Sequence, residues 1–165
     1  MEHPRLRHRR ASWLGGVPDR ERERRAVAED RCEIGIAFYP QPRPEIEALL
    51  RLPAPLLAVM APDHRLAEHR FLALGDQAAE PVALPTARFG IRHLLDHIVK
   101  THNVELAVRL ETNSVDMLRQ FAICGLGITF LPAFGIEREL RAGTLVAVPL
   151  EREIVSPSTL QVVKR

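Results

Sequence analysis

NSVDMLRQFAICGLGITFLP, residues 113–132, carries the clearest local signal for the fold. Asn113 and Ser114 are both residue types that cap helix N-termini, and VDMLRQFAIC after them has the apolar spacing of a helix. That pattern stops at Gly125, a residue type that favours helix ends. GLGITFLP then supplies the apolar run of a buried strand. The stretch therefore predicts a capped helix that leads directly into a core strand.

Outward from this stretch, strand-length and helix-length segments alternate. Residues 89–103 carry apolar side chains at helical spacing, which gives one apolar stripe along a helix. Shorter helices are predicted at 75–80 and 134–140. Apolar runs of strand length occupy residues 32–38, 55–62, 81–85, 106–111, 144–150 and 159–164, with a weaker segment at 46–52. This alternation predicts an α/β fold with a largely parallel sheet and helices on both of its faces.

The composition, 46% hydrophobic and 27% charged, is that of an ordinary soluble globular protein. No apolar run approaches the roughly 20 residues that a membrane helix needs. The first residues have charges but no apolar stretch of signal-peptide length behind them. We therefore expect a cytoplasmic protein without membrane contact.

Charge is distributed unevenly along the chain. Residues 1–25 carry a net charge of +4, and residues 26–165 carry a net charge of −2. A basic arm can bind nucleic acid, but beyond Trp13 this one has no aromatic pattern for base stacking. We attribute its arginines to a GC-rich coding sequence and expect residues 1–20 to be disordered. A short charged helix is predicted at 19–29.

No motif for catalysis, a cofactor or a metal stands out. Cys32 and Cys124 lie in apolar runs without zinc-site spacing, so buried reduced thiols are expected. His93 and His97 are one helical turn apart, and we favour a surface helix over a metal pair. His64 ends a Pro-Asp-His sequence that predicts a turn rather than a catalytic pair, because no nucleophile motif accompanies it. We expect a non-enzyme without a cofactor.

Four motifs, taken in chain order, resemble the effector-binding domain of LysR-type transcriptional regulators. They are Glu33-Ile34-Gly35-Ile36-Ala37, then Ala61-Pro62-Asp63-His64-Arg65-Leu66-Ala67, then Phe89-Gly90-Ile91-Arg92, and finally Gly125-Leu126-Gly127-Ile128 with Leu131-Pro132 and Gly143-Thr144-Leu145-Val146. Each motif is weak alone, but four in this order with family-like spacing are specific. The resemblance extends over residues 27–164.

The resemblance implies a two-lobed α/β fold of the type 2 periplasmic-binding-protein class. Residues 21–165 would form the effector-binding domain, with a nearly complete second lobe at 58–132 and a partial first lobe at 26–52 and 140–164. Glu33 stands where the family usually has aspartate, and Arg65 where it usually has proline, without consequence for the fold. The family's helix-turn-helix domain, the first strand-helix-strand of the first lobe and the C-terminal helix have no counterpart in this sequence. We therefore expect a truncated regulator without sequence-specific DNA binding of its own.

Two turns of the second lobe are the candidate effector site. Ligands of open α/β folds bind beyond the carboxyl ends of strands, where helix N-termini favour anions, and the resemblance implies that the effector cleft lies there. After strand 81–85 the candidates are Thr86, Arg88, Phe89 and Arg92, and after strand 106–111 they are Thr112, Asn113 and Ser114. Thr129 and Phe130, near the crossover, are weaker candidates. The alternative is structural, with Asn113 and Ser114 as helix caps, Phe89 as a core anchor and the arginines solvated.

The leading hypothesis is a sensing domain for a small, anionic metabolite, alone or as a homodimer. In an intact regulator, effector binding would bias closure of the two lobes and be read out by DNA-binding domains. The alternative is an interaction protein that pairs with a full-length regulator through the incomplete lobe, whose open sheet edge and apolar patch would invite a partner.

Overall fold

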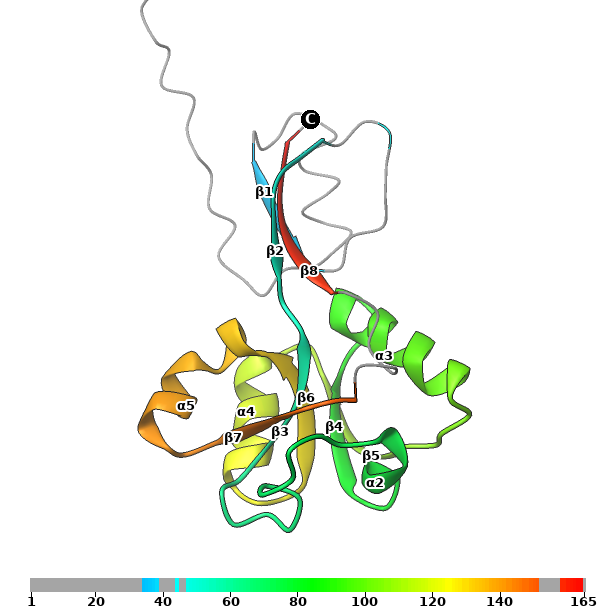
Figure 1. Ribbon diagram of the computed structural model, residues 1–165, viewed down its shortest axis with the longest axis vertical. Coiled ribbons are helices and arrows are strands. Elements are labelled where there is room, and N and C mark those ends of the chain that lie inside the picture. Colours follow the sequence, from blue (N-terminus) through cyan, green and yellow to red (C-terminus); the bar gives the residue numbers. More distant parts are fainter. Residues whose placement is uncertain (1–33, 39–43, 45–46, 152–157, 165) are drawn as a thin grey trace, which may run out of the picture.

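The computed structural model describes residues 34–38, 44, 47–151 and 158–164, which form two β-sheets of different size (Figure 1). A small sheet has the strand order β1-β8-β2, and a large sheet has the order β5-β4-β6-β3-β7. The predicted helix at 19–29, the predicted disorder at 1–20 and Cys32 lie outside the described residues. Among the residues described, no helix is both long enough and apolar enough to cross a membrane.

The large sheet comprises β3 (Leu56–Met60), β4 (Pro81–Pro85), β5 (Ala107–Thr112), β6 (Ile128–Pro132) and β7 (Val146–Pro149). β4 is parallel to both β5 and β6, as the prediction of a largely parallel sheet requires. β3, however, is antiparallel to both of its neighbours, β6 and β7. The prediction is wrong for β3 because that strand enters from the small sheet rather than through a helical crossover.

Helices α3 (Gly90–Thr101) and α4 (Val115–Ile123) connect the parallel strands of the large sheet. The chain passes from β4 outward to β5 through α3 and returns to β6 on the other side of β4 through α4. Because such crossovers are right-handed, these opposite steps place the two helices on opposite faces of the sheet. The remaining helices are short: α2 (Leu74–Gln77), η1 (Ala133–Gly135) and α5 (Glu137–Ala142).

The stretch at 113–132 folds as its sequence predicts. Ser114, rather than Asn113, is the N-cap of α4, and its side chain accepts a hydrogen bond from the Met117 N–H at 3.3 Å. All five residues of β6 are buried. Gly127 joins the two elements with a φ of 149°, and a Cβ added there would stand 2.0 Å from the Pro81 carbonyl oxygen. Only glycine therefore fits between α4 and β6 at this position.

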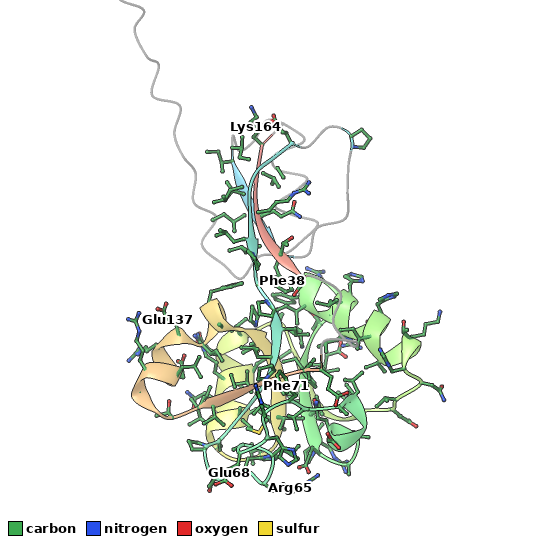
Figure 2. All side chains as sticks on the ribbon, viewed as in Figure 1. Phe38, Arg65, Glu68, Phe71, Glu137 and Lys164 are labelled. Atoms are coloured by element: carbon green, nitrogen blue, oxygen red, sulfur yellow. The ribbon has the colours of Figure 1, made fainter. Side chains whose placement is uncertain are left out.

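The small sheet is wholly antiparallel, with β8 (Thr159–Lys164) between β1 (Gly35–Phe38) and β2 (Glu47–Pro53). It is joined to the large sheet by two chain segments that bond to each other. The Ala54 N–H donates to the Ser158 carbonyl at 3.0 Å, and the Ser158 hydroxyl donates to the Ala54 carbonyl at 2.7 Å. Figure 2 shows the small sheet standing away from the larger body, with Phe38 at the junction.

Two expectations differ from the structure. Residues 140–164 were expected in the first lobe, but β7 is the edge strand of the large sheet and only β8 from that range lies in the small sheet. The open side of β3 accepts β7 in register, Ala58 against Val148, and this pairing buries Val148. Cys124, expected to be a buried thiol, is exposed because it is the C-cap of α4, where that helix reaches the surface.

Candidate functional site

The two turns singled out in the sequence lie side by side in the structure. β4 and β5 are parallel neighbours, with Pro85 opposite Thr112, so the strands end at the same edge of the large sheet. Beyond them, the Thr86 N–H donates to the Thr112 carbonyl at 3.0 Å. We call residues 86–89 the first turn and residues 112–114 the second turn. This bond continues the strand ladder by one residue and holds the turns together.

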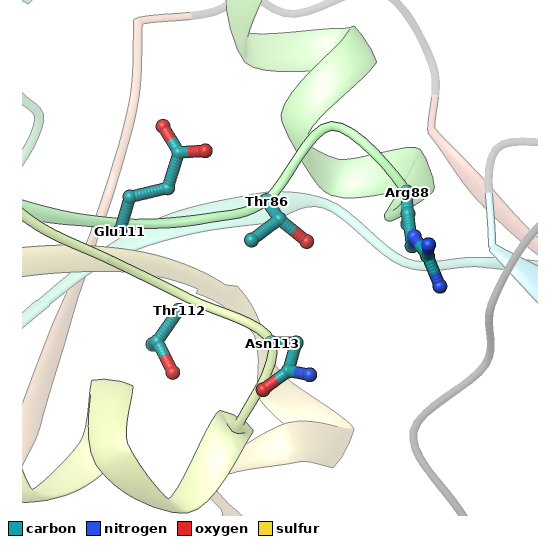
Figure 3. Close-up of a pocket in the computed structure, with 5 residues that line it drawn as sticks. All are labelled: Thr86, Arg88, Glu111, Thr112 and Asn113. Atoms are coloured by element: carbon teal, nitrogen blue, oxygen red, sulfur yellow. The ribbon is translucent and has the colours of Figure 1, made fainter.

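A pocket of about 360 Å³ lies between the two turns, lined by Thr86, Arg88, Glu111, Thr112 and Asn113 (Figure 3). Four of these residues are among those expected at the site. Glu111 was missed, although it ends the predicted strand 106–111 and so precedes Thr112 at the same sheet edge. All five lining residues are polar or charged. The volume is in the range of pockets that hold small molecules.

Thr86 has the most informative side chain of the pocket. Its Oγ1 is buried and has no hydrogen-bond partner in the part of the chain that the structure describes. The Thr112 hydroxyl, by contrast, accepts a hydrogen bond from the Ser114 N–H at 3.1 Å. A buried hydroxyl without a partner is costly and uncommon in folded proteins. A ligand that hydrogen-bonds to Thr86 would remove that cost.

Arg92 bonds to the strand ends that lead into the two turns and does not line the pocket. Its Nη1 donates to Glu111 Oε2 at 2.8 Å and to the Pro85 carbonyl at 3.1 Å, and its Nε donates to Asp96 at 2.7 Å. Partial burial lowers the pKa of Arg92, but its hydrogen bonds to Glu111 and Asp96 outweigh this, so the pKa is raised overall. In Figure 3 the Glu111 carboxylate accordingly points away from Thr112 and Asn113.

Both helices that follow the turns begin beside the pocket (Figure 3). Phe89 is the N-cap of α3 and has no side-chain cap bond, and its N–H donates to the Thr86 carbonyl at 3.1 Å. The N-terminal helical turn of α3 contains no acidic residue. The corresponding turn of α4 has Asp116, which pairs with Arg119. The N-terminus of α3 therefore presents its positive dipole end beside the pocket with no acidic residue in its own first helical turn, a setting that favours anions.

The remaining expected site residues are not part of the pocket wall. Phe89 and Ser114 lie at the helix starts, and the Phe89 side chain is buried. Thr129 and Phe130 lie in β6 with no exposed surface. The Thr129 hydroxyl donates to the Ala83 carbonyl of β4 at 2.9 Å, so it stabilises the sheet beneath the site.

Three histidines singled out in the sequence, His64, His93 and His97, lie in the described residues. His64 closes a turn, because its N–H donates to the Ala61 carbonyl at 3.1 Å, and this confirms the predicted turn. Its ring bridges the Leu66 N–H and Glu80 Oε2, each at 3.2 Å. His93 and His97 are exposed on α3. Within the described ranges, no three His, Cys, Asp or Glu side chains are grouped as a metal site would require.

The model of the LysR substrate binding domain matches residues 19–165. The chain belongs to this family. As a LysR substrate-binding domain it is 30% identical over 124 residues to the HTH-type transcriptional regulator BbuR of Bordetella bronchiseptica, covering 75% of this chain and 38% of that protein. It is 33% identical over 129 residues to the uncharacterized HTH-type transcriptional regulator YeiE of Escherichia coli, covering 77% of this chain and 44% of that protein.

Solved structures show the same fold. The effector binding domain of QuiR, in complex with shikimate, superposes with a TM-score of 0.74 at 16% identity, covering 91% of this chain and 68% of that one. The regulatory domain of Synechocystis CcmR, in complex with 2-PG, also gives 0.74, at 20% identity, covering 89% and 70%. The two-lobed α/β fold of the periplasmic-binding-protein type is therefore established for this LysR substrate-binding domain. The chain spans less than half the length of BbuR and YeiE.

Proposed function

We propose that this LysR substrate-binding domain senses a small anionic metabolite, which binds in the pocket between the first and second turns. The observation that carries the proposal is the buried Thr86 Oγ1, which has no hydrogen-bond partner among the described residues and lies at the pocket. A ligand carboxylate or phosphate oxygen could accept a hydrogen bond from that hydroxyl. Such an oxygen would also lie near the positive end of α3.

The wall of the pocket supports a small and polar ligand over a large apolar one. Among the described residues, its lining contains no aliphatic or aromatic side chain, and its volume is about 360 Å³. Arg88 supplies a guanidinium suited to planar anions. None of the five lining residues is a histidine, cysteine or lysine, and the carboxylate of Glu111 is paired with Arg92 at 2.8 Å. We therefore propose reversible binding, with the chemistry of a sensor rather than an enzyme, in a protein of the cytoplasm.

The proposal is tested by thermal unfolding with a panel of anions: shikimate, citrate, lactate, inorganic phosphate and benzoate, against sodium chloride. A bound anion at a hundred times its dissociation constant should stabilise the protein by about 2.7 kcal/mol. Arg88→Gln should weaken that anion, whereas Arg138→Gln, at an exposed position of α5, should not. If no anion of the panel raises the unfolding temperature, or if both variants respond like the wild type, the proposed site is wrong.

A second candidate function, pairing with another LysR-family chain, is favoured by the small sheet. Ile36 and Leu50 both stand opposite Val162, so the three share one face, and both are exposed by more than two fifths. A partner chain that covered this face would bury them. Analytical ultracentrifugation should then show a dimer that Leu50→Arg dissociates. A monomer at every concentration would remove self-pairing from consideration, and co-sedimentation with a full-length regulator tests the other partner.

The chain itself should lack sequence-specific DNA binding. A promoter fragment and a scrambled fragment of equal length should bind equally weakly at physiological salt, because a basic segment alone recognises phosphates rather than bases. Preference for the promoter fragment would contradict this part of the proposal.

A further inference from the structure

Phe38, the last residue of β1, touches the start of α3. A Cβ added at Gly90 would stand 2.2 Å from the Phe38 carbonyl oxygen, 3.3 Å from its carbonyl carbon and 3.7 Å from its Cδ1. Backbone atoms of the small sheet therefore rest directly on the backbone of the first helical residue. The contact exists only because residue 90 has no side chain. Phe38 itself is 6% exposed, although β1 is an edge strand of a small sheet.

The phenyl ring of Phe38 makes a second contact with the large-sheet body. It packs against Phe134 of η1, with ring centroids 6.2 Å apart and planes tilted by 55°, a favourable arrangement for two aromatic rings. Phe38 thus bridges the start of α3 and the segment that follows β6. Figure 2 shows it at the base of the small sheet, where the two bodies meet.

Gly90 follows the first turn of the pocket without an intervening residue. Phe89, the residue before it, bonds back to the Thr86 carbonyl, and its own carbonyl accepts the Arg92 N–H at 3.1 Å. Thr86 and Arg88 of this turn line the pocket. Gly90 is therefore linked to the pocket wall by a hydrogen-bonded turn.

We propose that Phe38 and Gly90 are positioning residues for the pocket: their contact seats the small sheet against α3 and holds the first turn in place. The importance of this contact for ligand binding rests on the proposed function, but the coupling between the small sheet and the first turn does not. The pair Ala54 and Ser158, where two segments joining the sheets are hydrogen-bonded to each other, would serve as a pivot in this arrangement. Without the Phe38 contact, the small sheet would turn about that pivot and the first turn would lose its support.

The test is hydrogen–deuterium exchange of the full chain without any ligand, comparing Gly90→Ala with the wild type. Alanine is the better helix former, and the φ of Gly90 lies outside the positive range, so only the clash with Phe38 disfavours it. Gly75→Ala in α2 is the matched control, because a Cβ there meets nothing within 4 Å. Phe38→Ala keeps the carbonyl and removes the ring, and so tests the ring contact with Phe134 by itself.

We expect Gly90→Ala to accelerate exchange in residues 35–38 and in residues 86–93 together, on the order of tenfold, with β6 unchanged. Phe38→Ala should accelerate the same two segments, and Gly75→Ala neither. Unchanged exchange in Gly90→Ala, or acceleration in residues 35–38 with a fully protected first turn, would overturn the coupling. Equal acceleration throughout, β6 included, would mean global destabilisation and would also overturn it. Because no ligand is present, a failed anion screen leaves this test intact.

Discussion

The guanidinium of Arg92 donates to the carboxylate of Glu111 at 2.8 Å and thereby joins the N-terminal end of helix α3 to the end of β5. The same Nη1 also bonds to the Pro85 carbonyl at the end of β4. One side chain thus fastens both strands whose ends form the pocket. Its partner Glu111 is about half exposed, whereas Arg92 is 20% exposed, so part of this interaction is shielded from water.

The hydrogen bonds of Arg92 to Glu111 and Pro85 form a clamp, and their loss should destabilise the protein. Arg92→Met removes the bonds to Glu111 and Pro85 and should lower the free energy of unfolding by about 1–2 kcal/mol, measured by urea denaturation. Arg141→Met is the matched control, because its bond to Glu137 joins two exposed side chains of one helix. That control should cost less than about 0.5 kcal/mol. Equal losses in the two variants would show that Arg92 is only a surface residue.

The contribution of Arg92 should not depend on pH near neutrality. Because the folded-state pKa of Arg92 is raised above its ordinary value, the stability from its charge is fully present below that ordinary pKa and is lost only when strong alkali titrates the folded state. The difference in unfolding free energy between wild type and Arg92→Lys should therefore be the same at about pH 7 and about pH 9. A difference that changes over this interval would mean that another group controls the clamp.

Thr86→Val should separate binding from stability. The substitution removes a buried hydroxyl that has no partner among the described residues, so the free energy of unfolding should stay the same or rise by up to about 1 kcal/mol. Affinity for the anion found in the thermal screen should fall about tenfold, or 1.4 kcal/mol, in calorimetric titration.

Thr129→Val is the control for the hydroxyl at position 86, because its hydroxyl is equally buried but bonded to the Ala83 carbonyl. This variant should lose about 1–2 kcal/mol of stability and keep the affinity of the wild type. The reverse pattern, a stable Thr129→Val with weakened binding, would place the ligand elsewhere.

Ser114 and Asn113 are neighbours in the second turn, and we expect Ser114 to stabilise the fold and Asn113 to contribute to anion binding. Ser114→Ala removes the N-cap of α4 and should cost about 1 kcal/mol of unfolding free energy. Asn113→Ala changes an exposed side chain at the pocket wall, and it should cost less than about 0.5 kcal/mol while weakening anion binding. If Asn113→Ala is the more destabilising of the two, the cap has been assigned to the wrong residue.

The two glycines between α4 and β6, Gly125 and Gly127, should differ in how well they tolerate substitution by alanine. Gly127→Ala combines a positive φ with a backbone clash against Pro81, and should cost about 3 kcal/mol or more by urea denaturation. Gly125→Ala has a positive φ of 66° but open space around the added methyl, so about 1 kcal/mol is expected. Similar losses at both positions would contradict the close approach of β6 to the start of β4.

Much of the candidate site could be predicted because local sequence patterns indicate where helices start and strands end. Thr86, Arg88, Thr112 and Asn113 all line the pocket, as their positions after two predicted strands suggest. Glu111 was missed, and Arg92 was expected at the site but does not line the pocket, because the direction of a side chain at a strand end depends on partners brought from another element. Arg92 turns to Glu111, which is distant in sequence and adjacent only once β4 and β5 pair.

The stretch at 113–132 determined by itself a helix capped at Asn113 or Ser114, a buried strand after it and glycine between them, because capping, apolar period and backbone freedom are local properties. The structure then assigned the cap to Ser114. Together with three other motifs the stretch also determined the family. Tertiary structure alone decided that β3 runs against its neighbours, that β7 closes the edge of the large sheet and that Phe38 rests on Gly90. These features depend on which distant segments meet, and their energies come from pairing and close packing that no single segment contains.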